Sequence, residues 1–274
     1  MKLGYVCTNY NNSAYTRVAV DTLLKIPGHD YRVVVVDNAS DSENVQALRA
    51  IQQDYSLVDV IYSQENAGYF RGLNAGIARL REQHPDVEWM VVGNNDLEFP
   101  EDFVTQLDAN RERLSVYPII SPDVVTLDGE HQNPHVIDRI SKVREFFYDI
   151  YYSNYYVGMA LLKLASMAPS LSERSDEQQW RIARPIYQGH GSCYILGPKF
   201  FALFGQFWAP TFMMSEEFFL SKQLQDKGHK VYYDPCIRVL HHWHASLATL
   251  PGKRRWQMAR DAHREYRKYV KVLG

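Results

Sequence analysis

Apolar and polar positions follow two different periods along the first hundred residues. Short apolar runs are separated by segments in which apolar residues recur every three or four positions. Residues 33–36 are four consecutive valines, which is typical of a strand buried on both faces. The predicted strands are residues 3–7, 33–36, 57–62 and 88–92, and the helices between them end near residues 27, 53 and 84. This alternation predicts a mostly parallel α/β sheet with right-handed crossovers.

The pattern is less regular after residue 98. Residues 123–129 resemble a hairpin at a sheet edge, and residues 131–190 show no clear period. The predicted helices are residues 103–114, 199–204 and 216–227, and the predicted strands are residues 116–121, 191–196 and 231–240. We predict one domain over residues 1–248, with a nucleotide-binding half (1–98) and an acceptor-binding half (99–248), and a basic helical appendage over residues 249–274.

Polar side chains follow three of the predicted strands. They are Thr8 to Asn11, Asp37 to Ser40, and Asn94-Asn95-Asp96. The carboxyl ends of parallel strands share one edge of a sheet, which is where open α/β sheets bind ligands. The three groups are therefore expected to meet in one site. For residues 94–96 alone, an ordinary Asn-rich turn is the alternative. Residue 42, a serine, is expected to cap the helix after the second strand.

Composition narrows the functional classes. The chain has 274 residues, of which 46% are hydrophobic and 23% charged, and its net charge of −2 gives no indication of nucleic-acid binding. The three cysteines are far apart, without metal-like spacing, and are expected to be free thiols in a reducing compartment. Residues 1–6 are expected to begin a strand rather than a signal peptide, and no apolar run approaches the length of a membrane span. We expect a cytoplasmic protein.

Several motifs between residues 3 and 246 together carry a resemblance to a known family. They are Thr8-Asn9-Tyr10-Asn11, Asp37-Asn38-Ala39-Ser40, the Gly- and Asn-rich residues 66–76, Asn94-Asn95-Asp96, Glu216-Glu217, and His241-His242 with Ser246. The chain resembles family-2 glycosyltransferases of the GT-A type, which are inverting transferases that use nucleotide sugars, and within them the bacterial rhamnosyltransferase-like branch. The resemblance implies a GT-A fold. It also implies transfer from a UDP- or dTDP-sugar to a saccharide or lipid-linked saccharide, as in synthesis of cell-surface polysaccharides.

The resemblance assigns the donor site to residues from the first four strand ends. Asp37 fits because a carboxylate accepts the N3–H of uracil or thymine, whereas a helix-capping role is its alternative. Gly68 and the glycines after it bring backbone close to a partner. A dinucleotide loop would follow the first strand instead, so tight helix packing is the remaining alternative for this stretch. The nucleotide-sugar-binding residues implied are Thr8, Tyr10, Asp37, Asn38, Asn66, Gly68, Asn74, Asn94 and Asn95.

A divalent cation is implied at the fourth strand end. Asp96 corresponds to the retained acid of the family's Asp-x-Asp position, with His241 and His242 as further metal ligands or phosphate contacts. Oxygen ligands suit Mg²⁺ or Mn²⁺. With one carboxylate, the site would bind its metal weakly until the phosphates of the substrate complete it. The alternative for the histidines is a surface cluster.

The resemblance favours Glu217 as the catalytic base, with Glu216 as the second candidate. Inverting transfer needs a base that takes the proton of the acceptor hydroxyl. Acids in a first helical turn are also common because they interact with the helix dipole. A nucleotidyltransferase or an inactive sugar-binding relative is the alternative function. The first would be expected to carry a Gly-rich basic loop after the first strand, which residues 8–13 lack.

Two further segments have open roles. Aromatic residues at 146–156 and 207–208 either form the acceptor side or belong to the core or an oligomer interface. The basic residues 253–271 carry Trp256, Ala259, His263, Tyr266 and Val270 at helical spacing. Such a helix either lies on an anionic membrane, which would make the protein peripheral, or packs its apolar stripe on its own domain.

Overall fold

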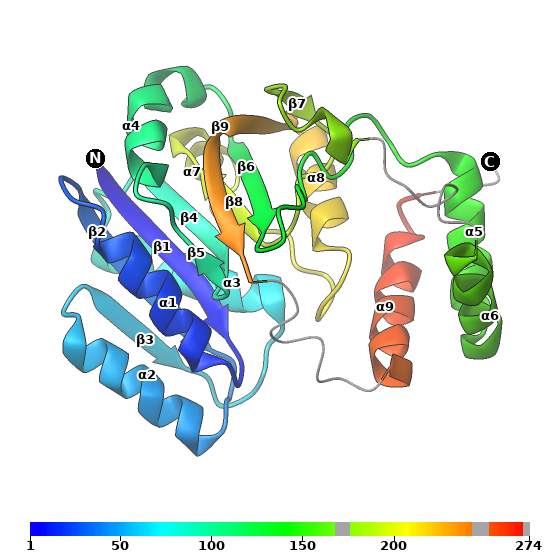
Figure 1. Ribbon diagram of the computed structural model, residues 1–274, viewed down its shortest axis with the longest axis horizontal. Helices are drawn as coiled ribbons and strands as arrows, with labels where there is room; N and C mark the ends of the chain where they lie inside the picture. The colour runs from blue at the N-terminus through cyan, green and yellow to red at the C-terminus, as the bar shows by residue number, and fades with distance from the viewer. Residues whose placement is uncertain (168–175, 243–251, 271–274) are drawn as a thin grey trace.

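The computed structural model describes residues 1–167, 176–242 and 252–270, and it shows one nine-stranded sheet flanked by helices (Figure 1). The strand order is β3-β2-β1-β4-β8-β6-β9-β5, and β7 pairs with β9. Strands β3, β2, β1 and β4 are parallel to one another. The predicted α/β class with a mostly parallel central sheet is therefore confirmed.

The first half of the chain supplies the regular part of this sheet. Its elements are β1 (Lys2–Asn9), α1 (Ser13–Leu24), β2 (Asp30–Asp37), α2 (Ser42–Asp54), β3 (Val58–Tyr62), α3 (Tyr69–Gln83) and β4 (Trp89–Asn94). All seven follow the apolar pattern. The predicted cap of α2 is wrong, because Asp41 rather than Ser42 is the N-cap. Its carboxylate accepts from the backbone nitrogen of Asn44 at 2.9 Å, which satisfies one of the free N–H groups of the first turn.

The second half adds mixed pairing. Its elements are β5 (Leu97–Glu98), α4 (Phe103–Leu114), β6 (Ile119–Thr126), α5 (Lys142–Ser153), α6 (Tyr155–Ser166), β7 (Arg184–Ile186), β8 (Cys193–Leu196), α7 (Pro198–Leu203), α8 (Glu216–Gln225), β9 (Val231–His241) and α9 (Gly252–Tyr266). The predicted hairpin at residues 123–129 is confirmed in part. The chain turns after Thr126, whose backbone nitrogen donates to the oxygen of Glu130 at 2.9 Å, and Val125 forms an antiparallel bridge with His131. Residues 123–126 are not a separate edge strand, however. Strand β6 continues through Pro122 to Thr126, with a register shift after the proline, and it is buried along its whole length between β8 and β9. Proline lacks the N–H that the ladder needs, so the pairing shifts there instead of ending.

The sheet has a core on each face. Alternate side chains of a strand point to opposite faces, so Tyr5 and Val6 belong to different cores. The first core joins the sheet to α1, α2 and α4 through Leu23, Ile51 and Phe103. The second core joins it to α3, α7 and α8 through Phe70, Phe200 and Leu220. Both faces of the central strands are covered, which explains the valine run of β2.

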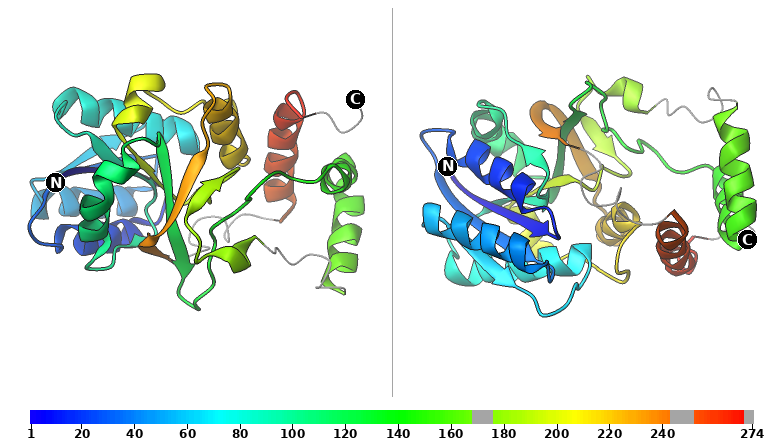
Figure 2. Two further views of the ribbon diagram at one scale, coloured as in Figure 1. Left: turned by 90° about the horizontal axis from the view of Figure 1, so that it is seen from above. Right: turned by 60° about the horizontal axis from the view of Figure 1, so that its bottom comes forward.

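Helices α5, α6 and α9 form a lobe beside the sheet. Figure 2 shows α9 between α8 and the α5–α6 pair from two directions. Trp256 and Tyr266 of α9 are buried, and the indole nitrogen of Trp256 donates to the backbone oxygen of Tyr151 at 3.3 Å. The ring of Tyr266 meets that of Phe218 on α8. The apolar stripe of the basic helix thus packs on its own chain. The predicted boundary at residues 248 and 249 lies outside the described residues.

Within the described parts of the chain, none of the helices combines the length and the apolar character needed to cross a bilayer.

Tight packing of α3 on the sheet leads to a prediction about stability. A Cβ on Gly76 would lie 2.3 Å from Cγ1 of Val6 and 3.0 Å from Cγ2 of Val36, both on the sheet. We expect Gly76→Val to lower the free energy of unfolding by about 1–3 kcal/mol through overpacking. Ala75→Val, on the exposed side of the same helix, is the control and should change it by less than about 0.5 kcal/mol. Urea unfolding measures both, and equal effects of the two changes would contradict the packing.

Candidate functional site

Asn9, the last residue of β1, connects the ends of three strands. Its amide nitrogen donates to Oδ1 of Asp37 at 2.9 Å, and its amide oxygen accepts from Nδ2 of Asn95 at 3.1 Å. The hydroxyl of Thr16 on α1 donates to the same amide oxygen at 2.9 Å and accepts from Asn95 at 2.7 Å. All four side chains are buried. The polar ends of β1, β2 and β4 therefore meet at one edge of the sheet, as the sequence predicts.

Asp37 is bound mainly by its own loop. Asp37 is 1% exposed. Oδ1 accepts from Asn9 and from the hydroxyl of Ser40, and Oδ2 accepts from the backbone nitrogen of Ser40 at 3.1 Å. A carboxylate has about four lone-pair positions. These bonds orient the group and leave Oδ2 with capacity for one further donor.

Gly68 allows the loop before α3 to approach the loop before α8. Its φ is +90°, and a Cβ there would lie 2.0 Å from the backbone oxygen of Phe212. Asn66 Oδ1 accepts from the nitrogen of Gly68 at 2.9 Å, and Asn38 Nδ2 donates to its oxygen at 3.3 Å. The other amide atom, Asn38 Oδ1, is buried without a hydrogen-bond partner. Residues 38, 66 and 68 are thus brought together, with one acceptor left for a ligand.

The other predicted donor-site residues Thr8, Tyr10 and Asn74 lie in three different environments. Asn74 on α3 exchanges two 2.8 Å hydrogen bonds with the backbone of Phe207, which occupies both ends of its amide in a structural clamp. Thr8 lies at the end of β1 beside Asn94 of β4. Tyr10, in the loop after β1, is 45% exposed. Thr8 therefore lies at the shared edge, Tyr10 is accessible to solvent, and Asn74 is not directed toward the other site residues.

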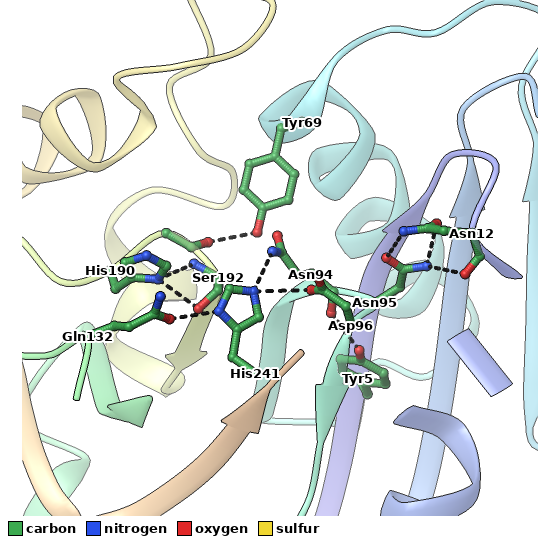
Figure 3. A network of polar contacts seen from close by, with 11 residues as sticks. Tyr5, Asn12, Tyr69, Asn94, Asn95, Asp96, Gln132, His190, Ser192 and His241 are labelled. Carbon is green, nitrogen blue, oxygen red and sulfur yellow. Dashed lines mark hydrogen bonds and ion pairs between the residues drawn. The ribbon is translucent and has the colours of Figure 1, made fainter. Parts of the chain in front are cut away.

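Asp96 and His241 form the second part of the site (Figure 3). Strand β5 pairs with β9, so that Leu97 lies opposite His241. Nε2 of His241 is 3.3 Å from Oδ1 of Asp96, and Asn94 Nδ2 is 3.2 Å from the same ring nitrogen. Both residues are buried. Burial alone would raise the pKa of Asp96, but the contacts with His241 and Asn94 outweigh it and lower this pKa below its usual value.

The partner of the other ring nitrogen decides what Nε2 can bind. Nδ1 of His241 donates to Oε1 of Gln132 at 2.7 Å. In the neutral ring this leaves Nε2 with a lone pair. Oδ1 of Asp96 is buried and makes no hydrogen bond. In that state Nε2 accepts from the amide nitrogen of Asn94 at 3.2 Å and lies 3.3 Å from Oδ1 of Asp96. A metal ion between Nε2 and Oδ1 would replace the contact with Asn94.

This pair fits a small divalent cation. Ligand atoms about 2.1 Å from one ion and at right angles to each other lie about 3 Å apart, close to the observed separation. A carboxylate oxygen and an imidazole nitrogen suit Mn²⁺, and Mg²⁺ less well. Among the described residues there is no group of three His, Cys, Asp or Glu side chains that could hold a metal. The described residues therefore offer two ligands here, and a metal ion would take its remaining positions from water or substrate.

His242 points to another group. Its Nε2 is 3.0 Å from Oε2 of Glu98, and its ring lies against that of Tyr15. The structure thus places the side chain of His241, but not that of His242, beside the carboxylate of Asp96. The backbone nitrogen of His242 donates to the backbone oxygen of Asp96 at 2.9 Å. Residues 244 and 246 of the same motif lie outside the described residues.

Gln132, His190 and Ser192 are site residues that the sequence did not reveal. Gln132 orients His241, and the ring of His190 lies 5.7 Å from that of His241. Ser192 bonds to His190, and its backbone oxygen accepts from the nitrogen of Asn94 at 2.8 Å. Residues 132 and 190 come from stretches without a regular period. The one local signal is His190 between two glycines directly before a strand.

Glu216 and Glu217 begin α8, and they lie in different surroundings. The two preceding residues, Met214 and Ser215, both have positive φ, a conformation that costs free energy and clusters at functional sites. Glu217 lies against the backbone of Gly191, where a Cβ would be 2.6 Å from its Oε1. Glu216 is 8% exposed, and its Oε1 has no hydrogen-bond partner. Burial, and then the charge of Glu217, raise the pKa of Glu216 to about 8.

The loop at residues 190–192 connects the two glutamates to Asp96 and His241. The hydroxyl of Tyr69 on α3 donates to the backbone oxygen of Gly191 at 2.7 Å. Gly191 lies between His190 and Ser192, so one short loop contacts Glu217 on one side and the surroundings of His241 on the other. The polar strand ends, the acid–imidazole pair and the two glutamates therefore form one continuous site.

The fold and site define an α/β protein with a polar ligand site at the carboxyl ends of its parallel strands. Comparison with known families makes this specific. Residues 6–160 match the sequence profile of the family described as "Glycosyl transferase family 2". This match covers more than half of the chain, and the protein belongs to that family. A search of curated protein sequences finds no match.

Solved structures confirm the GT-A fold. GalNAc-T7 with UDP, GalNAc and Mn²⁺ superimposes with a TM-score of 0.58 and 13% identity, over 100% of this chain and 52% of that one. The mannosyltransferase PcManGT from Pyrobaculum calidifontis, with GDP-Man and Mn²⁺, superimposes with a TM-score of 0.57 and 15% identity, over 99% of this chain and 65% of that one. S. aureus TarS 1-349 superimposes with a TM-score of 0.55 and 11% identity, over 100% of this chain and 74% of that one. The chain thus spans about half to three quarters of the length of these proteins, and at such identities the likeness concerns the fold.

The raised pKa of Glu216 gives a testable pH dependence. The folded protein keeps a proton up to about pH 8 that the unfolded chain releases near pH 4.5. Stability therefore falls as pH rises between these values, by on the order of 1 kcal/mol per pH unit. We expect Glu216→Gln, which stays neutral, to gain stability relative to wild type as pH rises from 5 to 8, measured by thermal unfolding. The same change at the exposed Glu112 is the control. A constant difference across this range would contradict the raised pKa.

Proposed function

We propose that this protein is a metal-dependent inverting glycosyltransferase that uses a UDP- or dTDP-sugar. The observation that carries the proposal is the buried pair of Asp96 and His241, whose Oδ1 and Nε2 lie 3.3 Å apart at the edge where the polar strand ends meet. That edge is where α/β sheets bind ligands. A nucleotidyltransferase is disfavoured because the loop after β1 holds asparagines bonded to Asn95 rather than a Gly-rich basic triphosphate loop.

The donor is bound by the ends of β1, β2 and the loop before α3. The free capacity of Asp37 Oδ2 accepts the N3–H of uracil or thymine, and Asn38 Oδ1 supplies a second acceptor. Thr8, Tyr10, Asn66 and Gly68 complete this side as residues that shape the loop or contact the nucleotide. Asn74 acts indirectly, by fixing residue 207.

Asp96 and His241 would hold Mg²⁺ or Mn²⁺ together with the donor's diphosphate. Bound there, the ion would act as a Lewis acid that stabilises the charge on the leaving diphosphate. Gln132 keeps Nδ1 of His241 protonated, so that Nε2 faces the ion. Asn94 and Asn95 position the turn that carries Asp96, and His242 supports the same region through Glu98.

The transfer step needs one base. Glu217 takes the proton of an acceptor hydroxyl while that oxygen attacks the anomeric carbon from the face opposite the leaving group. The new C–O bond forms as the bond to the diphosphate oxygen breaks, and the nucleoside diphosphate leaves with the electron pair. Glu216, with its pKa raised to about 8, is mostly protonated at neutral pH and is therefore the weaker candidate.

The acceptor is a saccharide or lipid-linked saccharide, bound by the half of the chain after residue 98. A rhamnosyltransferase in cell-surface polysaccharide synthesis is the most specific form of the proposal, and it rests on the sequence resemblance. We place the protein in the cytoplasm, with the α9 lobe as the part that would contact a membrane surface.

A screen of nucleotide sugars by thermal shift, with and without Mn²⁺, tests the donor class. We expect stabilisation by uridine or thymidine diphosphate sugars that depends on the metal. A guanosine or adenosine donor that stabilises equally would contradict the role of Asp37. Stabilisation that is unchanged by chelator would contradict the metal site.

Glu217→Gln tests the base. The amide keeps the size of the side chain but cannot take a proton, so kcat for transfer should fall by about 100-fold or more. Nucleotide affinity in the presence of Mn²⁺ should stay near wild type, which calorimetry measures. Glu216→Gln is the matched comparison, and its kcat for transfer should fall by less than that of Glu217→Gln. The reverse order of the two losses would assign the base to Glu216.

Gln132→Leu tests the orientation of His241. Without the oxygen acceptor, the ring is no longer held with its lone pair toward Asp96, and Mn²⁺ affinity in the presence of nucleoside diphosphate should fall by about 10-fold or more. Gln132→Glu keeps an acceptor at this position and should restore binding. If the leucine and glutamate variants bind Mn²⁺ equally well, Gln132 does not orient the ligand.

A further inference from the structure

A groove separate from the strand ends lies between α5 and α9. Its volume is about 390 Å³. Helix α9 contributes Arg260, His263 and Arg264, which are one, three or four positions apart, and Arg267 follows in the turn directly after the helix. Helix α5 contributes Asp149, Tyr152 and Ser153 at the same kind of spacing. Figure 1 shows these two helices in the lobe beside the sheet, apart from the ends of β1, β2 and β4.

Arginines outnumber acids among the side chains that line the groove. Three arginines face a single carboxylate among its lining side chains. That carboxylate, Asp149, is already bound by Arg267, whose Nε and Nη2 each lie 2.9 Å from one of its oxygens. Arg260 is paired with Asp261 at the groove edge, and Arg264 lies 3.8 Å from the same acid with a side chain that is 70% exposed. Glu145 lies 4.0 Å from Arg267, so each of the three arginines has an acid nearby. Arg264 is the most exposed of them and the one most available to a ligand.

A buried polar atom on the groove wall has no hydrogen-bond partner. His263 is 8% exposed, and its Nε2 makes no hydrogen bond, although Asp149 Oδ1 is 3.5 Å away. Leaving such a group unsatisfied costs free energy, which a ligand in the groove would recover. Burial lowers the pKa of His263 to about 4 against the opposing effect of Asp149, so the ring is neutral at neutral pH and its one N–H is available to an oxygen.

We propose that the α5–α9 groove is a second binding site, for a phosphate group carried by an anionic lipid or by a small soluble phosphate. Arginine side chains bind phosphate oxygens through pairs of charged hydrogen bonds. The site is independent of the proposed transfer reaction, since neither Asp96 nor the glutamates of α8 line it. It gives the basic helix a defined ligand pocket rather than a diffuse attraction to anionic surfaces.

A pair of charge reversals on α9 tests this site. Arg264→Glu changes a groove residue, and Arg254→Glu changes an exposed arginine of the same helix outside the groove. The two variants have the same net charge. Binding is measured without divalent cations or donor, so that the metal-dependent site does not contribute. One arm titrates inorganic phosphate and pyrophosphate at constant ionic strength, and the other sediments vesicles of phosphatidylcholine with or without phosphatidylglycerol.

We expect wild-type protein to bind in at least one arm, and the arm that responds identifies the source of the phosphate. Arg264→Glu should weaken that binding by about 10-fold or more, the equivalent of one charged hydrogen bond, and Arg254→Glu by less than about twofold. Equal weakening by the two variants would overturn the proposal in favour of unspecific attraction. Failure of the wild type to bind in both arms would also overturn it, whereas loss of transfer activity would not bear on it.

Discussion

The pairing of β5 with β9 is the constraint on which the site depends. This two-residue strand follows the turn at residues 94–96 and places Leu97 opposite His241. Asn94 and His241, which are 147 positions apart, come within hydrogen-bond distance as a result. Strand β9 is held in turn by β6, itself buried between two neighbours. The return of the chain to the end of β4 therefore creates the acid–imidazole pair, and the loss of that pairing would separate its two members.

The polar groups of this site are buried, so each one either has a hydrogen-bond partner or costs free energy. The network around Asn9 gives both ends of its amide group hydrogen-bond partners, and it fixes the strand ends in one arrangement. Asp96 Oδ1, Asn38 Oδ1 and Glu216 Oε1 are buried acceptors or carboxyl oxygens without hydrogen-bond partners. Buried groups of this kind are costly, so their concentration along one edge indicates a surface organised for a ligand. The lobe of α5, α6 and α9 also holds a buried polar atom without a hydrogen-bond partner, Nε2 of His263.

Much of the fold was predictable because its signals are local. The valine run of β2 and the helical spacing of α1 to α4 follow from burial on one or two faces. The failures have local causes too. Asp41 competes with Ser42 for the cap, and both are good capping residues. The predicted strand over residues 116–121 ended before Pro122, and only the two neighbours of β6 in the sheet explain why this strand continues through the proline.

By itself the sequence determined the α/β class, the meeting of three polar strand ends and the acids that head α8, because strand direction and helix starts are set by short stretches of chain. Tertiary structure decided which of these groups meet. It placed His241 beside Asp96 and directed His242 to Glu98, although the two histidines are adjacent in sequence. It brought Gln132 and His190, from stretches without a regular hydrophobic period, next to His241. It also bonded the side chain of Asn74 to the backbone of Phe207. Such choices depend on which side chains face each other across distant segments, and no local pattern records that.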